Sequence, residues 1–171
     1  AKDDYIGGTT DYALSSKMLR INPSLIISSG LEGVNPYARF GLVIGMGSVI
    51  YQIEDNDGGD IQFMKVKMNG GMAIGLNAAI GATYSLTETM SLFAEAHMIN
   101  MSYAPNKGEL IEATYNGADQ LPNMTTQDKE TEFVNEYTIS FSNPQSDSQP
   151  DTELKQKLPF GSFGLQLGVR I

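Results

Sequence analysis

The residues best suited to chemistry are Glu95 and His97, which lie two positions apart, and His97 is the only histidine in the chain. An imidazole titrates near neutral pH, so a neighbouring carboxylate could form an acid/base pair or a proton relay with it. Nucleophilic catalysis would also need a nucleophile oriented by the base, and none accompanies this pair. We therefore predict a structural role for the pair and expect that the protein is not an enzyme.

A candidate metal site lies in the acidic segment that begins at Glu54 and reads Glu-Asp-Asn-Asp-Gly-Gly-Asp. Asp55, Asp57 and Asp60 alternate around a glycine turn and could offer oxygen ligands to Ca²⁺. The distal bidentate glutamate of a calcium loop is missing, because Val66 occupies that position. The alternative is an acidic hairpin tip that uses Asp-Gly and Gly-Gly turn chemistry, and we favour it over a weak calcium site. No other cofactor is expected.

Long β-strands are the elements expected to position these side chains. From Met64 to Tyr84, apolar residues alternate with small and polar ones over 21 positions, whereas a typical strand has about 5–6 residues. A strand of this length suits a tilted crossing of a lipid bilayer that continues beyond it. The same two-faced pattern recurs in four further segments: Leu19–Ser28, Arg39–Tyr51, Leu92–Met101 and Phe163–Ile171.

The second face of these segments is small and polar, which suits a narrow, packed lumen. Charged residues fall on this face, and we predict that they form one interior polar network because buried charges need partners. Its members are Arg20, Arg39, Glu95, His97 and Arg170. The predicted fold is therefore an all-β, antiparallel, up-and-down transmembrane β-barrel, in which the apolar faces contact lipid.

Composition limits the functions that this chain can have. The formal net charge of −9 argues against binding to nucleic acid, whose phosphates are recognised by Lys and Arg. The absence of cysteine excludes disulfides and Cys-based metal sites. No run of about 18 apolar residues occurs, so a transmembrane helix is not expected.

The connections between the expected strands alternate in length. Those near 30–37 and 85–89 are short, whereas those at 54–63 and 105–157 are long and acidic. Outer-membrane barrels have short periplasmic turns and long extracellular loops, so the acidic connections are placed outside the cell. Within the longest one, Glu109–Tyr115 and Glu132–Phe141 are expected to form a paired ribbon, and residues 143–152 a flexible return. Long loops on rigid scaffolds often carry recognition, so this loop is the candidate surface for binding other outer-membrane proteins.

Residues 1–171 are expected to form a single barrel domain, but five strands do not complete one. Bacterial single-chain barrels have an even number of strands and at least about eight. The count therefore predicts that the complete protein has eight strands and that this chain lacks its N-terminal ones.

Three motifs carry a resemblance to a known family: Asn35–Leu42, Gly81–Leu86 and Leu158–Phe163. They resemble turn and girdle segments of the OmpA-like eight-stranded outer-membrane β-barrels, and the likeness covers about residues 18–171. Members usually end in an aromatic residue where this chain has Ile171.

The resemblance implies a location in the cell outer membrane, with outer-membrane lipid and lipopolysaccharide as surroundings. It also implies a non-enzymatic role as a structural or interaction component of the cell envelope. The alternatives are a barrel enzyme of protease or acyltransferase type, a small solute pore, and a soluble ligand-binding barrel. A pore is disfavoured because about eight strands enclose an interior that side chains fill.

Overall fold

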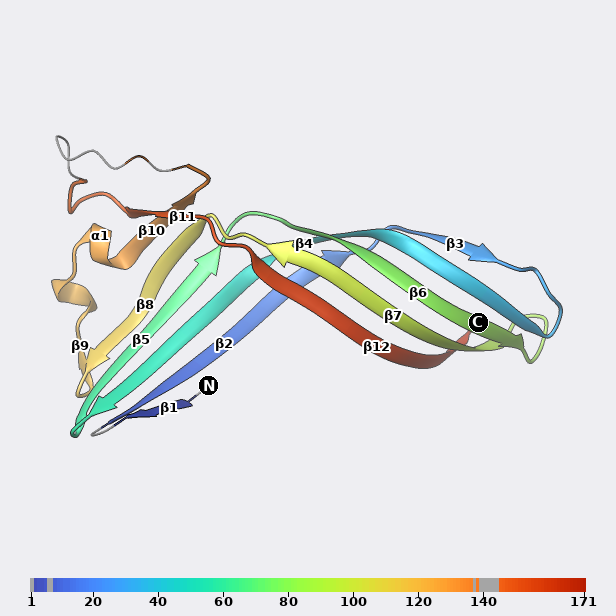
Figure 1. The fold of residues 1–171 in the computed structure, drawn as a ribbon, viewed down its shortest axis with the longest axis horizontal. Helices are drawn as coiled ribbons and strands as arrows, with labels where there is room; N and C mark the ends of the chain where they lie inside the picture. Colours follow the sequence, from blue (N-terminus) through green and yellow to red (C-terminus); the bar gives the residue numbers. More distant parts are fainter. Residues whose placement is uncertain (1, 6–7, 137, 139–144) are drawn as a thin grey trace. The chain divides into compact units, whose positions relative to one another are not determined.

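The computed structural model describes residues 2–5, 8–136, 138 and 145–171, and in these the chain is mainly β-strand with almost no helix (Figure 1). Antiparallel pairing dominates, and the sheet does not close on itself in the described part of the chain. None of the helical segments among these residues has the length and apolar character needed to span a membrane. The chain forms two compact units. Unit 1 comprises Ala1–Met18, Met46–Gly71 and Ala104–Gln156, and unit 2 comprises Leu19–Gly45, Met72–Tyr103 and Lys157–Ile171.

Unit 2 is a five-stranded antiparallel sheet, in the order β3, β4, β6, β7 and β12. β4 is 24 residues long, and only its first half lies in unit 2, where residues 34–45 pair with β6. The strands are β3 (Ser24–Ser28), β4 (Val34–Asp57), β6 (Ala73–Ser85), β7 (Ser91–Tyr103) and β12 (Leu158–Arg170). The five segments for which the sequence predicts strands therefore all contribute strands to this sheet.

The two faces of unit 2 differ in burial in a way that the alternation explains. On the central strands β4, β6 and β7 the polar face is buried, at Tyr37, Val43, Asn77, Glu95 and Tyr103. On the edge strands β3 and β12 its polar side chains, such as Ser24 and Ser162, are exposed. The apolar face is exposed, and its outermost positions on β12 are 76–83% exposed. Its large side chains are Leu25, Ile27, Phe40, Leu42, Ile44, Ile74, Leu76, Ile80, Leu92, Met98, Phe163, Leu165, Leu167 and Val169.

Unit 1 is a second sheet region in which the latter half of β4 pairs with β5, β5 with β8, β8 with β10, and β10 in parallel with β11. β2 pairs with both β1 and β4. A capping box of Thr125 and Asp128 starts the short helix α1. The elements are β1 (Lys2–Tyr5), β2 (Gly8–Ile21), β5 (Asp60–Asn69), β8 (Lys107–Tyr115), β9 (Ala118–Asp119), η1 (Leu121–Asn123), α1 (Thr126–Lys129), β10 (Glu130–Val134) and β11 (Asp151–Leu154).

The prediction of one continuous strand from Met64 to Tyr84 is wrong, because the segment is divided between β5 and β6. Gly70 and Gly71 have φ values of 74° and 75°, a region that glycine adopts without steric cost. Three residues, 70–72, stand opposite only Met46 and Gly47 of β4, so the interruption is bulge-like. The alternation of apolar residues with small and polar ones continues on both sides of this break, so the sequence pattern alone cannot reveal it.

The prediction of a long loop at 54–63 is also wrong, and the hairpin-tip alternative is confirmed. β4 and β5 continue to Asp57 and Asp60, which are cross-strand partners. Only Gly58 and Gly59 form the turn, and both have positive φ, as two-residue hairpin turns of this kind require.

The segment 105–157 contains regular structure, but the predicted pairing of Glu109–Tyr115 with Glu132–Phe141 is not what forms, because Glu109–Tyr115 pairs with β5 and only residues 107–109 pair with β10. β8 includes the expected strand Glu109–Tyr115, and it pairs with β10 through Glu109 and Glu130. The second expected strand is confirmed only for 132–134, and residues 137 and 139–141 lie outside the described residues. The expected flexible return at 143–152 is described from residue 145 onward, and its last two residues belong to β11.

Candidate functional site

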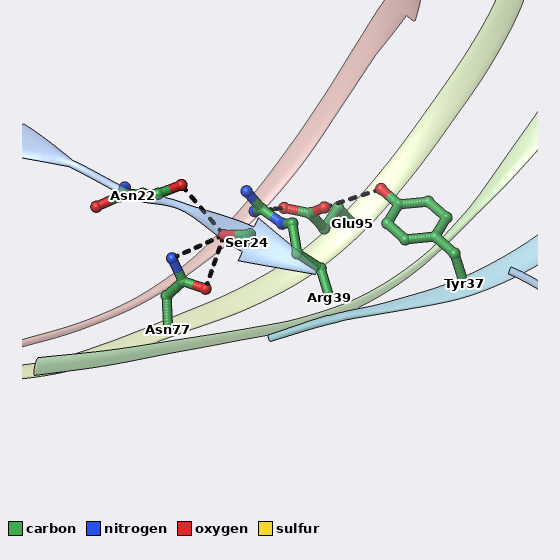
Figure 2. Close-up of polar contacts among 6 residues, drawn as sticks. All are labelled: Asn22, Ser24, Tyr37, Arg39, Asn77 and Glu95. Carbon is green, nitrogen blue, oxygen red and sulfur yellow. Dashed lines mark hydrogen bonds and ion pairs between the residues drawn. The ribbon is translucent and has the colours of Figure 1, made fainter. Parts of the chain in front are cut away.

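A compact polar cluster lies on the polar face of unit 2 and centres on Glu95 of β7 (Figure 2). The Tyr37 hydroxyl donates a hydrogen bond to Glu95 Oε2 at 2.9 Å. Arg39 Nη2 donates to Glu95 Oε1 at 2.5 Å and forms an ion pair with it. The Glu95 side chain is only 6% exposed and that of Arg39 29% exposed, so the carboxylate is buried and both of its oxygens have partners.

A glycine between the two strands makes this cluster sterically feasible. Tyr37 on β4 stands opposite Gly81 on β6, and Gly81 stands opposite Glu95 on β7. A Cβ atom on Gly81 would lie 2.7 Å from the Tyr37 ring and 2.5 Å from the Ala94 carbonyl oxygen. Because Gly81 has no side chain, the Tyr37 ring can lie across β6 and reach the carboxylate.

The same arrangement recurs one strand farther toward the β3 edge of the sheet. Ser24 on β3 stands opposite Gly41, which stands opposite Asn77 on β6. Asn77 Nδ2 donates to Ser24 Oγ at 3.2 Å across this glycine, and Ser24 Oγ also lies 3.2 Å from the Asn22 carbonyl oxygen (Figure 2). His97 repeats the packing, because a Cβ on its cross-strand partner Gly164 would lie 2.7 Å from its ring.

Only part of the predicted polar network is joined by contacts. Arg39 and Glu95 are paired, whereas Arg39 Nε and His97 Nδ1 are buried without a hydrogen-bond partner among the described residues. Arg170 lies within electrostatic range of Tyr37 but, like Arg20, forms no ion pair in the described part of the chain.

Tyr37, Ser24 and Asn77 belong to these clusters but were not predicted from the sequence. The signal for Tyr37 was its position two residues before Arg39, which places both on one face of a strand. The two clusters are held by side-chain hydrogen bonds and, in the first, by the ion pair between Arg39 and Glu95.

The three aspartates proposed as calcium ligands lie at the β4–β5 hairpin, where Asp55 and Asp60 engage separate partners. Asp55 Oδ1 accepts a hydrogen bond from Thr10 at 2.7 Å, and Asp60 Oδ1 accepts one from Asn116 at 2.9 Å. Within the described residues, no three His, Asp or Glu side chains are grouped as a metal site.

Asn116 connects the β4–β5 hairpin with the next hairpin tip. It lies in the Asn-Gly turn between β8 and β9, with φ 48°, and its side chain also accepts from the Ile61 amide at 2.7 Å. Hydrogen bonds from Asn116 and Tyr115 lower the pKa of Asp60. The bond to this carboxylate raises the pKa of Tyr115, so charged Asp60 and neutral Tyr115 are stabilised together.

Charge is divided unequally between the two units. Unit 1 holds 17 of the 20 acidic residues, and unit 2 holds Glu32, Glu88 and Glu95. All three arginines belong to unit 2. One lysine of unit 1, Lys65, forms an ion pair across strands with Glu112, whose Oε2 lies 3.6 Å from its Nζ. Unit 1 therefore carries a large excess of negative charge.

A polar pocket of about 310 Å³ lies on this acidic unit beside β8 and β10. Carboxylates dominate the charges that line it, with one lysine among them: Lys107, Glu109, Glu130 and Glu132. Glu109 and Glu130 are direct cross-strand partners, an arrangement of like charges that usually destabilises a sheet.

Comparison of the chain with protein-family models, curated proteins and solved structures gives no match.

Proposed function

We propose that unit 2 is part of the wall of an outer-membrane β-barrel and that the protein is a non-enzymatic structural or interaction component of the cell envelope. The observation that carries this proposal is the exposed apolar face of unit 2. Leu165 and Leu167 are 78% and 83% exposed, and large aliphatic side chains continue across all five strands. Water-soluble monomers rarely expose a contiguous apolar patch of more than a few hundred Å².

The direction of the alternation supports a membrane in preference to a soluble sandwich. In a sandwich the apolar face is buried, whereas in unit 2 the buried face carries Asn77, Glu95 and several glycines. An apolar hollow of about 610 Å³ on unit 2, bordered by Val34, Tyr84 and Leu92, has the character of a surface in contact with acyl chains. Outer-membrane lipid and lipopolysaccharide are the surroundings that we propose for this face.

Interaction with other envelope proteins is assigned to unit 1. Its net negative charge and its polar pocket suit a basic partner surface, because complementary charge accelerates encounter and disfavours wrong partners. Segment 105–157, the proposed extracellular part, supplies β8, β10 and β11 to this surface.

The membrane proposal predicts opposite environments for two residues of β6, Ile74 and Asn77. The chain has no cysteine, so a single introduced cysteine can carry a spin label at either position. We expect the label at Ile74 to be relaxed by oxygen dissolved in lipid and the label at Asn77 to be shielded from lipid. A water-accessible label at Ile74 together with a lipid-exposed label at Asn77 would show that the orientation of the sheet is wrong.

The interaction proposal predicts that insertion and partner binding can be separated. Tyr103 and Leu158 are cross-strand partners, so a short Gly-Ser turn can replace Lys107–Lys155 without disturbing the β7–β12 pairing. We expect the shortened protein to retain heat-modifiable electrophoretic mobility and to lose the proteins that co-purify with the parent. If it retains all of them, unit 1 is only a solvated cap.

A further inference from the structure

The two outermost strands of unit 2 have unpaired edges that run in the same direction. In the described part of the chain, β3 pairs only with β4, and β12 pairs only with β7. Four successive antiparallel pairings separate β3 from β12, so these two strands are parallel to each other. An element that joins the edges by antiparallel pairing must therefore contain an odd number of strands. A second copy of the same five-stranded sheet in the same membrane orientation would bring parallel strands together at each seam.

The arginines show what chemistry the joining element needs. The central arginine, Arg39, is paired with Glu95, the only acidic residue on the polar face of unit 2. The other two belong to the edges. Arg170 is in β12. Arg20 is in β2 just before β3, and alternation places it on the polar side, opposite to Leu19 and Ile21. Both arginines are exposed. An element that covers this face would enclose both charges, which is costly unless they are paired.

We infer that the polar face of unit 2 is covered by a protein β-element with an odd number of strands, whose carboxylates face Arg20 and Arg170. The inference rests on the proposed barrel and deepens it by giving the chemistry of what closes it. Three strands are the smallest such element that reaches the eight strands of a small barrel. Buried Arg39 Nε and His97 Nδ1, which have no partner among the described residues, are further groups that the element can satisfy.

The test is a site-specific photo-cross-link from the polar face of β12. A benzophenone is attached to a cysteine at Ser162 in the full chain, in membranes of cells that produce it, and the cross-linked peptide is sequenced by mass spectrometry. We expect a strand in which Asp or Glu alternates with apolar residues. Arg170→Glu should reduce the cross-link yield at least about tenfold, Arg170→Lys should retain it, and Lys157→Glu, outside the strands, is the matched control.

Three results would overturn the inference. These are a label that cross-links to β3 or β12, a label that cross-links only to lipid, and a yield that is unchanged by Arg170→Glu. A parallel label at Leu165 on the apolar face separates this failure from failure of the proposed function. If Leu165 is exposed to lipid while Ser162 gives one of those outcomes, only the inference fails. If Leu165 is exposed to water, the barrel proposal itself fails.

Discussion

Replacement of Glu95 by Gln is expected to lower the free energy of unfolding by about 3–5 kcal/mol, because removing one partner of a buried ion pair leaves the other charge uncompensated. Glu95 accepts from both Arg39 and Tyr37, so one substitution weakens two contacts on one carboxylate. Unfolding by urea in detergent micelles, followed by tyrosine fluorescence, measures the change, since the chain has eight tyrosines and no tryptophan.

Two control variants test whether the loss of stability comes from the buried ion pair. Glu88→Gln changes an exposed acidic residue of the turn between β6 and β7, and it should alter stability by less than about 0.5 kcal/mol. The double variant Arg39→Met with Glu95→Leu should be more stable than Glu95→Gln alone, because no charge remains unpaired. Equal effects of Glu95→Gln and Glu88→Gln would contradict the structural role of the cluster.

A methyl group at Gly81 is expected to have the second large effect, a destabilisation of about 1–3 kcal/mol from overpacking. The Cβ of Gly81→Ala would lie 2.5 Å from the Ala94 carbonyl oxygen, so the backbone of β7 has to shift. It would also displace the Tyr37 ring and weaken the hydrogen bond to Glu95. The same urea unfolding experiment measures the loss.

Gly161→Ala in β12 is the matched control for this substitution. A Cβ at Gly161 has only one neighbour within 4 Å, the Ile99 carbonyl oxygen at 3.7 Å, which is an ordinary contact. We expect Gly161→Ala to be neutral or slightly stabilising, because it restricts the unfolded chain. If the two alanine variants are equally stable, the close approach of Tyr37 across β6 is not a constraint on the fold.

The strand segments and the faces of unit 2 could be predicted from the sequence because each depends on local alternation. Side chains of a strand point to opposite sides in turn, so Ile74, Leu76 and Ile80 had to share a face whatever their partners were. The strand at Glu109–Tyr115 was also predictable from its strand-like composition, but its pairing with β5 was not. The membrane location remains a prediction from this pattern.

The ends of strands depend on backbone conformation that alternation does not encode. Gly70–Gly71 and Gly58–Gly59 are similar in sequence, but the first pair interrupts a strand and the second reverses the chain. Which of these occurs is decided by the partners on β4, which pairs with β5 along one half and with β6 along the other.

Glu95, Arg39 and the alternating faces were therefore determined by the sequence itself, through residue type and the two-residue period of a strand. Only the tertiary structure decided that Arg39 takes Glu95 as its partner, that Tyr37 joins them across Gly81, and that His97 lies over Gly164 instead. The physical reason is register: a shift of one residue between neighbouring strands would move every one of these side chains to the opposite face. The hydrogen bond between Tyr37 and Glu95, which depends on this register, joins residues 58 positions apart in the chain, so no local pattern specifies it.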